Sequence, residues 1–181
     1  MGTRSMIGIE NPNTKAVKAI YCHWDGYLQH NGSLLEKHYS NSPKVNNLIA
    51  LGDLSSLGKE IGEKHPFSPH SSKEDEAAYN AAKDAGYCTF YTRDRGEDAP
   101  YKYFPTAKEA AEFYDGSWCE YFYLFKYDED LESGKWYYRT RENGRWKRLA
   151  TAMTKSKEDE VAWAGSNQSG LRPVTNSRSK V

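Results

Sequence analysis

The chain lacks the features that would place it at once in several broad classes. Its 25 basic and 25 acidic residues cancel to a formal net charge of zero, which argues against both a nonspecific DNA binder and an acidic DNA mimic. No apolar run approaches the ~20 residues that a membrane span needs, and the first residues lack the apolar core of a signal peptide. We therefore expect a cytoplasmic protein that contacts no membrane.

Cysteine is scarce, and metal-ligand and catalytic signatures are missing. The 3 cysteines, Cys22, Cys88 and Cys119, lie far apart in strand-like stretches, a pattern typical of reduced, buried thiols, with a nucleophile or metal ligand as the alternative. No ligand quartet has a spacing that suits zinc, and the Gly-x-Ser-x-Gly elbow, the phosphate loop and the Rossmann glycines are absent. We expect no metal and no cofactor, and these signals weigh against an enzyme.

Aromatic residues are abundant, with 14 Tyr, 6 Phe and 5 Trp. They alternate with polar residues along several stretches, as half-buried strands require, and Asn143-Gly144 has the chemistry of a tight hairpin turn. We predict an α+β fold with a largely antiparallel sheet of about five to six strands. The expected strands span residues 3–10, 16–23, 87–92, 118–127, 135–141 and 145–149.

Three to four helices are expected between these strands, from apolar residues at helical spacing and from capping residues such as Ser72 and Thr106. They span about residues 34–41, 43–51, 73–85 and 107–114. Residues 1–164 are predicted to form a single domain. Residues 165–181 are rich in Ser, Asn, Gly and basic residues without an apolar period, which predicts a flexible, disordered basic tail.

The densest cluster of reactive side chains is Cys22-His23-Trp24-Asp25-Gly26-Tyr27, where a predicted strand ends in a turn. His23 and Asp25 fall on the same side of an extended chain, so they could share a metal or orient a general base. Asp-Gly is also ordinary turn chemistry. A structural turn, a contact for a ligand or partner, and catalysis all remain open. The candidate contact residues are His23, Trp24, Asp25 and Tyr27.

Arg93 and Arg95 form a second candidate cluster, because an arginine fork can bind a phosphate or a carboxylate through two parallel hydrogen bonds. Acidic neighbours between residues 94 and 98 could pair with the arginines instead. This loop and the turn at residues 23–27 both follow predicted strands, and loops that leave strand ends gather at the rim of a sheet. We therefore predict that the two clusters lie close together and form one binding surface for a ligand or partner.

The aromatic stretches 121–127 and 136–141, followed by Trp146-Lys147-Arg148, have the composition of a base-stacking platform for single-stranded nucleic acid. The same composition suits a strand pair with one face in the core. We favour the core, and we do not expect a nucleic-acid partner.

Four blocks of the sequence together resemble a family of small uncharacterised proteins from tailed bacteriophages and prophages. The blocks are the Gly-Thr-Arg-Ser start at residues 2–5, residues 20–27, residues 48–58 and residues 93–97. The resemblance covers most of the chain from residue 2 to about residue 149. It implies a viral accessory protein in the cytoplasm of the bacterial host, and such proteins often disable a host factor.

We therefore expect a phage-encoded accessory protein that binds, and modulates or inhibits, a host factor or defence system without catalysis. One alternative is a protein that binds or hydrolyses a nucleotide signal, centred on His23 and Asp25. Another is single-stranded nucleic-acid binding through the aromatic hairpin. A host protein is the first expected partner and a nucleotide-like small molecule the second, and the oligomeric state is open.

Overall fold

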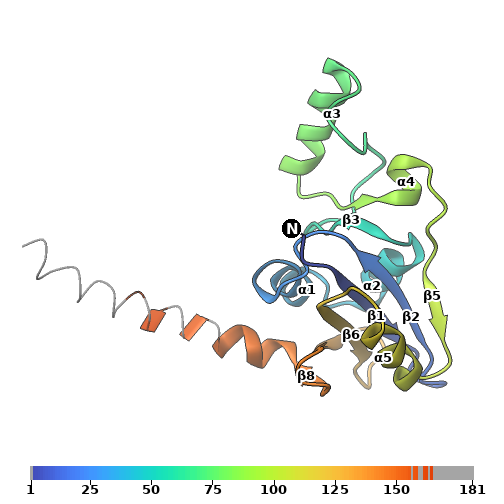
Figure 1. Ribbon diagram of the computed structural model, residues 1–181, viewed down its shortest axis with the longest axis vertical. Helices are drawn as coiled ribbons and strands as arrows, with labels where there is room; N and C mark the ends of the chain where they lie inside the picture. Colours follow the sequence, from blue (N-terminus) through green and yellow to red (C-terminus); the bar gives the residue numbers. More distant parts are fainter. Residues whose placement is uncertain (1, 156, 159–160, 163, 165–181) are drawn as a thin grey trace, which may run out of the picture.

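The computed structural model describes residues 2–155, 157–158, 161–162 and 164, so the predicted tail at 165–181 lies outside the described residues. Within them the chain forms one mixed sheet flanked by helices (Figure 1). The strands are β1 (Ser5–Glu10), β2 (Val17–Cys22), β3 (Leu54–Ser56), β4 (Thr89–Phe90), β5 (Lys102–Phe104), β6 (Tyr121–Tyr127), β7 (Gly134–Thr140) and β8 (Lys147–Arg148). The helices are the π-helical η1 (Leu28–Gly32), α1 (Ser33–His38), α2 (Ser42–Ala50), α3 (Lys73–Asp84), α4 (Tyr91–Arg95) and α5 (Ala107–Asp115), and residues 149–155 are also helical.

Across the described residues the sheet has eight strands, in the order β4-β3-β2-β1-β6-β7-β8, with β5 paired to β2. Most pairs are antiparallel, including the predicted N-terminal hairpin of β1 and β2. The pairs β1–β6 and β2–β3 are parallel, which requires longer crossover connections than a hairpin. The predicted mixed fold with a largely antiparallel sheet is confirmed.

The predicted counts of about five to six strands and three to four helices are wrong, because the additional elements are too short to show a period. Strands β3 and β5 have 3 residues each, β4 has 2, and η1 and α4 have 5 each. Alternation becomes legible only over about four or more residues. The predicted strand at residues 87–92 therefore shortens to β4, and α4 follows it directly.

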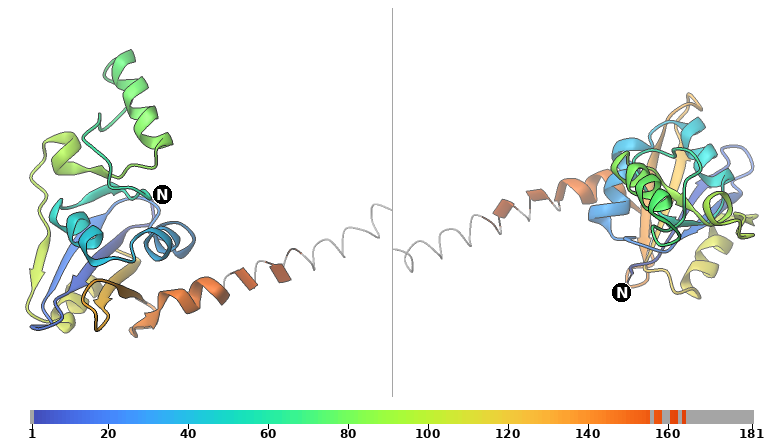
Figure 2. Two further views of the ribbon diagram at one scale, coloured as in Figure 1. Left: turned by 180° about the vertical axis from the view of Figure 1, so that it is seen from behind. Right: turned by 90° about the horizontal axis from the view of Figure 1, so that it is seen from above.

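Strand β6 contributes alternate side chains to two separate cores. Phe122 and Leu124 join the core beneath α5, whereas Tyr123 and Phe125 join the larger core beneath α1 and α2. Figures 1 and 2 show α5 on one face of the sheet and α1 and α2 on the other. Because successive strand residues point to opposite faces, these four side chains are buried on both sides of the sheet. They are core residues and present no stacking surface to a nucleic acid.

The three cysteines are buried and form no disulfide, as the sequence predicts. Burial raises the pKa of Cys22 to about 12 and also raises the pKa values of Cys88 and Cys119, because a thiolate is poorly stabilised away from water. These thiols are therefore packing residues with little nucleophilic character.

Trp136 and Trp118 offer a matched test of the core. Trp136 is 2% exposed and donates its indole N–H to the carbonyl oxygen of Tyr39 at 2.8 Å, whereas Trp118 is 80% exposed. We predict that Trp136→Ala lowers the free energy of unfolding by about 3–5 kcal/mol. Trp118→Ala should change it by less than about 0.5 kcal/mol. Urea unfolding followed by circular dichroism measures both, and equal effects would contradict the burial of Trp136.

Candidate functional site

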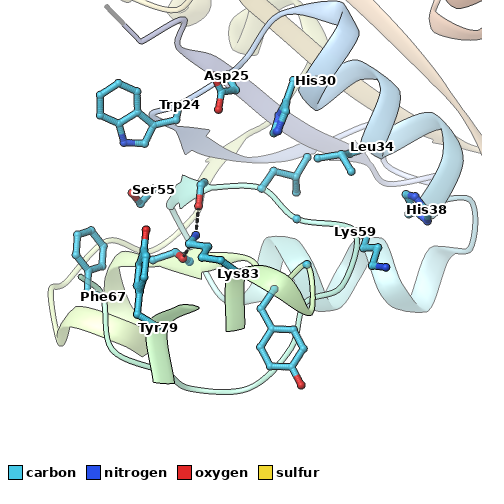
Figure 3. A pocket seen from close by; sticks show the side chains of 16 residues that line it. Trp24, Asp25, His30, Leu34, His38, Ser55, Lys59, Phe67, Tyr79 and Lys83 are labelled. Carbon is cyan, nitrogen blue, oxygen red and sulfur yellow. Dashed lines mark hydrogen bonds between the residues drawn. The ribbon is translucent and has the colours of Figure 1, made fainter. Parts of the chain in front are cut away.

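An open cleft of about 510 Å³ lies between the edge of the sheet and helix α3 (Figure 3). One wall comes from the turn after β2 and from η1 and α1. The floor comes from β3 and the residues that follow it, and the second wall comes from α3 and the segments on either side of it. The lining side chains of the cleft include Trp24, Asp25, Ser56, Lys59, Tyr79 and Lys83.

The turn after β2 presents Trp24 to the cleft. Asp25 has a positive φ of 56°, and the backbone N–H of Gly26 donates to the carbonyl oxygen of Thr3 at 2.7 Å. A Cβ atom at position 26 would collide with the Thr3 backbone, so this close approach requires glycine. From inside the core, the hydroxyl of Tyr123 donates to the carbonyl oxygen of Gly26 at 2.6 Å. The turn is therefore fastened to the sheet. On it, the side chain of Trp24 is 45% exposed.

Strand β3 forms the floor because it pairs with both β2 and β4. The backbone N–H groups of His23 and Trp24 donate to the carbonyl oxygens of Leu54 and Ser55 at 3.0 and 3.1 Å, which continues the β2–β3 pairing into the turn. The β3–β4 register shifts between Leu54 and Ser56. Such irregularities re-aim side chains, and both Ser55 and Ser56 line the cleft.

Lys83, in the last turn of α3, reaches from the helix to the floor of the cleft (Figure 3). Its Nζ donates to Ser56 Oγ at 2.7 Å and to Thr89 Oγ1 at 2.6 Å, and it lies 5.4 Å from the ring centroid of Tyr79. No carboxylate of the described residues forms an ion pair with it. Burial lowers the pKa of Lys83, because the ammonium form loses hydration. A perturbed amine in a cleft is a candidate functional group.

The cleft has an aromatic end and a basic end. In Figure 3, Trp24 and Phe67 lie toward one end and His38 and Lys59 toward the other, with Lys83 between them. The aromatic end offers apolar ring surface, whereas the basic end offers a cationic side chain. A molecule that spans the cleft would meet both.

Positive charge exceeds negative charge in the described lining of the cleft. Asp25 supplies its one carboxylate, whereas Lys59 and Lys83 supply two amines. In the described chain neither lysine forms an ion pair with a carboxylate. The molecule as a whole has no net charge, so this local excess is a property of the cleft.

The predicted turn residues divide into two groups. Trp24 and Asp25 line the cleft, whereas His23 and Tyr27 are not among its lining residues. The Nδ1 atom of His23 lies 2.7 Å from the hydroxyl oxygen of Tyr21, and its ring packs edge-on against Trp24 with 4.6 Å between the ring centroids. Burial lowers the pKa of His23. His23 therefore supports the Trp24 ring.

Arg93 uses all its guanidinium N–H groups within the protein. Its Nε and Nη2 atoms donate to the carboxylate of Asp94 at 3.0 and 3.1 Å. The other bonds, 2.9 to 3.1 Å long, reach the carbonyl oxygens of Ile61, Gly62 and Cys88. Because five donors meet five acceptor contacts, Arg93 acts as a clamp that joins its own segment to residues 61–62 and to Cys88, and it has no N–H group left for a ligand.

Arg95 is exposed and also has an acidic partner, Glu97, with 3.6 Å between Nε and Oε2. Its guanidinium carbon lies 5.0 Å from the ring centroid of Phe67. It lines a second cavity, of about 520 Å³, that shares Phe67 with the cleft. Trp24 and Arg95 therefore lie in two cavities that have Phe67 in common, and the structure does not bring them into one pocket.

Sequence reasoning missed Lys83, Ser56 and Thr89, which the fold brings together from three elements. No motif joins them, and Lys83 lies in the predicted helix over residues 73–85 at a position where the sequence pattern indicates no function. A weak signal exists in Gly58 and Gly86, because a Cβ atom on Gly58 would collide with the carbonyl oxygen of Gly86. Glycines that permit such close backbone contact indicate which segments touch, but not which side chains meet.

Comparison of the chain with protein-family models, curated proteins and solved structures gives no significant match. In the described part of the chain, no group of three or more His, Cys, Asp or Glu side chains gathers closely enough to hold a metal ion. None of the described helices combines the length and the apolar character needed to cross a bilayer. The cleft is therefore the feature of the structure that bears on function.

The two arginines differ in a way that stability measurements can test. Asp94 is buried, and Arg93 is the cation that neutralises it. We predict that Arg93→Met lowers the free energy of unfolding by about 3–5 kcal/mol, since it leaves a buried carboxylate unpaired. Arg95→Met, which removes an exposed charge, should change it by less than about 1 kcal/mol. Chemical denaturation measures the free energy of unfolding of both variants. A loss below about 1 kcal/mol for Arg93→Met would contradict its role as a clamp.

Proposed function

We propose that the protein binds a small anionic molecule that carries a planar ring, such as a nucleotide, in the cleft between the sheet and α3. The observation that carries this proposal is the pair of lysines, Lys59 and Lys83, in a cleft whose described lining has one carboxylate. An anion entering the cleft meets two amines that form no ion pair with a carboxylate of the described residues. Hydrogen bonds to such charged groups are stronger than bonds between neutral groups.

The aromatic end supports a ring-bearing ligand. Trp24 is 45% exposed on a turn that the Tyr123 hydroxyl bonds at Gly26, so the position of its ring is set before a ligand binds. Phe67 and Tyr79 lie on the other side of the cleft. Stacking of a base on an aromatic side chain contributes about 1–3 kcal/mol and tolerates different bases.

The resemblance to phage proteins suggests the setting of this binding. A phage-encoded protein with such a cleft would act in the host cytoplasm by removing or sensing an anionic host molecule, and would thereby modulate a host factor or defence system. Binding alone is sufficient for this role.

Adenosine 5′-monophosphate is a suitable probe, because adenosine and inorganic phosphate separate its two parts. We predict saturable binding by isothermal titration calorimetry, with weaker binding of either part alone. Trp24→Ala and Lys59→Met should each weaken binding about 10-fold, since each removes one stacking or one charged contact. Trp118→Ala and Lys108→Met, which remove exposed residues outside the cleft, are the matched controls. No saturable heat at millimolar probe, or equal losses in the control variants, would refute the proposal.

A protein partner is a second candidate, because Trp24 and Tyr27 are both exposed on one turn, at 45% and 37%. Tryptophan and tyrosine are frequent hot spots of interfaces. Since Tyr27 is outside the lining of the cleft, it separates the two functions. We predict that Tyr27→Ala weakens capture of a host protein from infected cells while leaving the affinity for adenosine 5′-monophosphate unchanged. If Tyr27→Ala leaves every captured protein at its wild-type level, this candidate function fails.

A further inference from the structure

The two hydroxyl groups that contact Lys83 Nζ suggest a chemical role for this amine in addition to its role in holding α3 against the sheet. Ser56 Oγ lies 2.7 Å from Lys83 Nζ, and Thr89 Oγ1 lies 2.6 Å from the same nitrogen. A serine in hydrogen-bond contact with an amine that lacks a carboxylate partner is one of the known forms of an activated nucleophile. The third bonding direction of Lys83 Nζ has no partner among the described residues.

We propose that Ser56 is a nucleophile, that Lys83 is its general base, and that Thr89 is a positioning residue that orients Lys83. The substrate class is an ester or another activated acyl compound small enough for the cleft. This inference goes beyond the proposed binding role, since binding of an anion needs neither a nucleophile nor a base.

The step balances with water as the only co-reactant. The Ser56 hydroxyl proton moves to neutral Lys83, the Oγ atom forms a bond to the acyl carbon, and the bond to the alkoxide leaving group breaks. The protonated Lys83 gives that proton to the leaving group. Water then attacks the acyl carbon and passes a proton to Lys83, the Ser56 ester bond breaks, and Lys83 returns the proton to Oγ.

The environment favours the neutral amine that this step requires. Burial lowers the pKa of Lys83, so a larger fraction of the amine is neutral near physiological pH than for an exposed lysine. The charged group that opposes this effect is the Asp94 carboxylate, because the thiols of Cys88 and Cys22, whose pKa values burial raises, favour the ammonium form only where they ionise. The neutral amine of Lys83 can donate an N–H to Thr89 Oγ1 while the lone pair on Lys83 Nζ receives the Ser56 proton. Thr89 therefore orients the amine.

The placement of Ser56 also suits a nucleophile. It is the last residue of β3, at the point where the β3–β4 register shifts, and it lines the cleft. Reactive side chains are often found beside such irregularities, because an irregular strand can turn a side chain out of the regular alternation. Strand β3 itself is held between β2 and β4, so the position of Oγ is set by the sheet.

A fluorophosphonate probe tests the inference, because its phosphorus accepts a serine oxygen and releases fluoride while the base takes the proton. We expect one adduct, mapped to Ser56 by peptide mass spectrometry, and none at that position in Ser56→Ala. The control is Ser40→Ala, which removes an exposed serine outside the cleft and should leave the labelling rate unchanged.

The Lys83→Arg variant tests whether Lys83 acts as a general base or only holds α3 in place by donating hydrogen bonds. Arginine keeps a positive charge and N–H donors for Ser56 and Thr89, but it does not deprotonate in proteins. We expect the labelling rate at Ser56 to fall at least about 100-fold, as loss of a general base predicts, with little change in the melting temperature. If Lys83→Arg does not fold, Lys83→Met replaces it, and the same fall in rate is expected.

Two results would overturn the inference: no adduct at Ser56 in the wild-type protein, or a labelling rate that Lys83→Arg and Lys83→Met leave unchanged. Calorimetry of the Ser56→Ala variant with adenosine 5′-monophosphate keeps the two proposals apart. Binding without an adduct in the wild-type protein retains the proposed binding role and rejects catalysis. An adduct at Ser56 without nucleotide binding supports the nucleophile and rejects the nucleotide-like ligand.

Discussion

The pair of Arg93 and Asp94 is the constraint on which the cleft depends. Arg93 joins the carbonyl oxygens of residues 61 and 62 to that of Cys88, so it closes the loop that carries α3. Asp94 adds bonds from the backbone N–H groups of His65 and Phe90, at 3.1 and 2.8 Å. Closing a loop of this length costs conformational entropy, and a buried, fully bonded pair offsets that cost. The pair therefore helps to hold α3 opposite the sheet.

Lys83 adds a second connection, from the far end of the same loop. Its bonds to Ser56 and Thr89 tie the last turn of α3 to β3 and β4, while the glycines at 58 and 86 let the two backbones meet. In the opposite wall, the turn at Trp24 extends from β2, is bonded to β3 through its backbone, and accepts a bond from the Tyr123 hydroxyl at Gly26. The backbone thus continues the sheet into this wall, whereas α3 in the other wall is fastened to the sheet by side chains.

The sequence predicted those parts of the fold that have a period or a cap. Ser72 and Thr106 accept the N–H of residues 75 and 109, as expected of N-caps, and the long strands were found from their alternation. The site was predicted only at Trp24 and Asp25, which lie in one compact block of sequence. Lys83 could not be predicted, because its role comes from contacts with Ser56 and Thr89 that three separate elements create. The arginine fork of Arg93 was correctly expected to bind an anionic group, but that group is the carboxylate of Asp94 within the protein and not a ligand.

The two roles considered for Lys83 make opposite demands on its charge. An anionic group on the floor of the cleft favours the ammonium form, whereas a general base must be neutral. Both demands are met if the anionic part of a ligand lies at Lys59, at the basic end, and an uncharged acyl group reaches Ser56. A ligand whose charge lies beside Lys83 would keep that amine protonated and Ser56 inert. The position of the ligand's charge along the cleft therefore determines whether the protein holds the molecule or reacts with it.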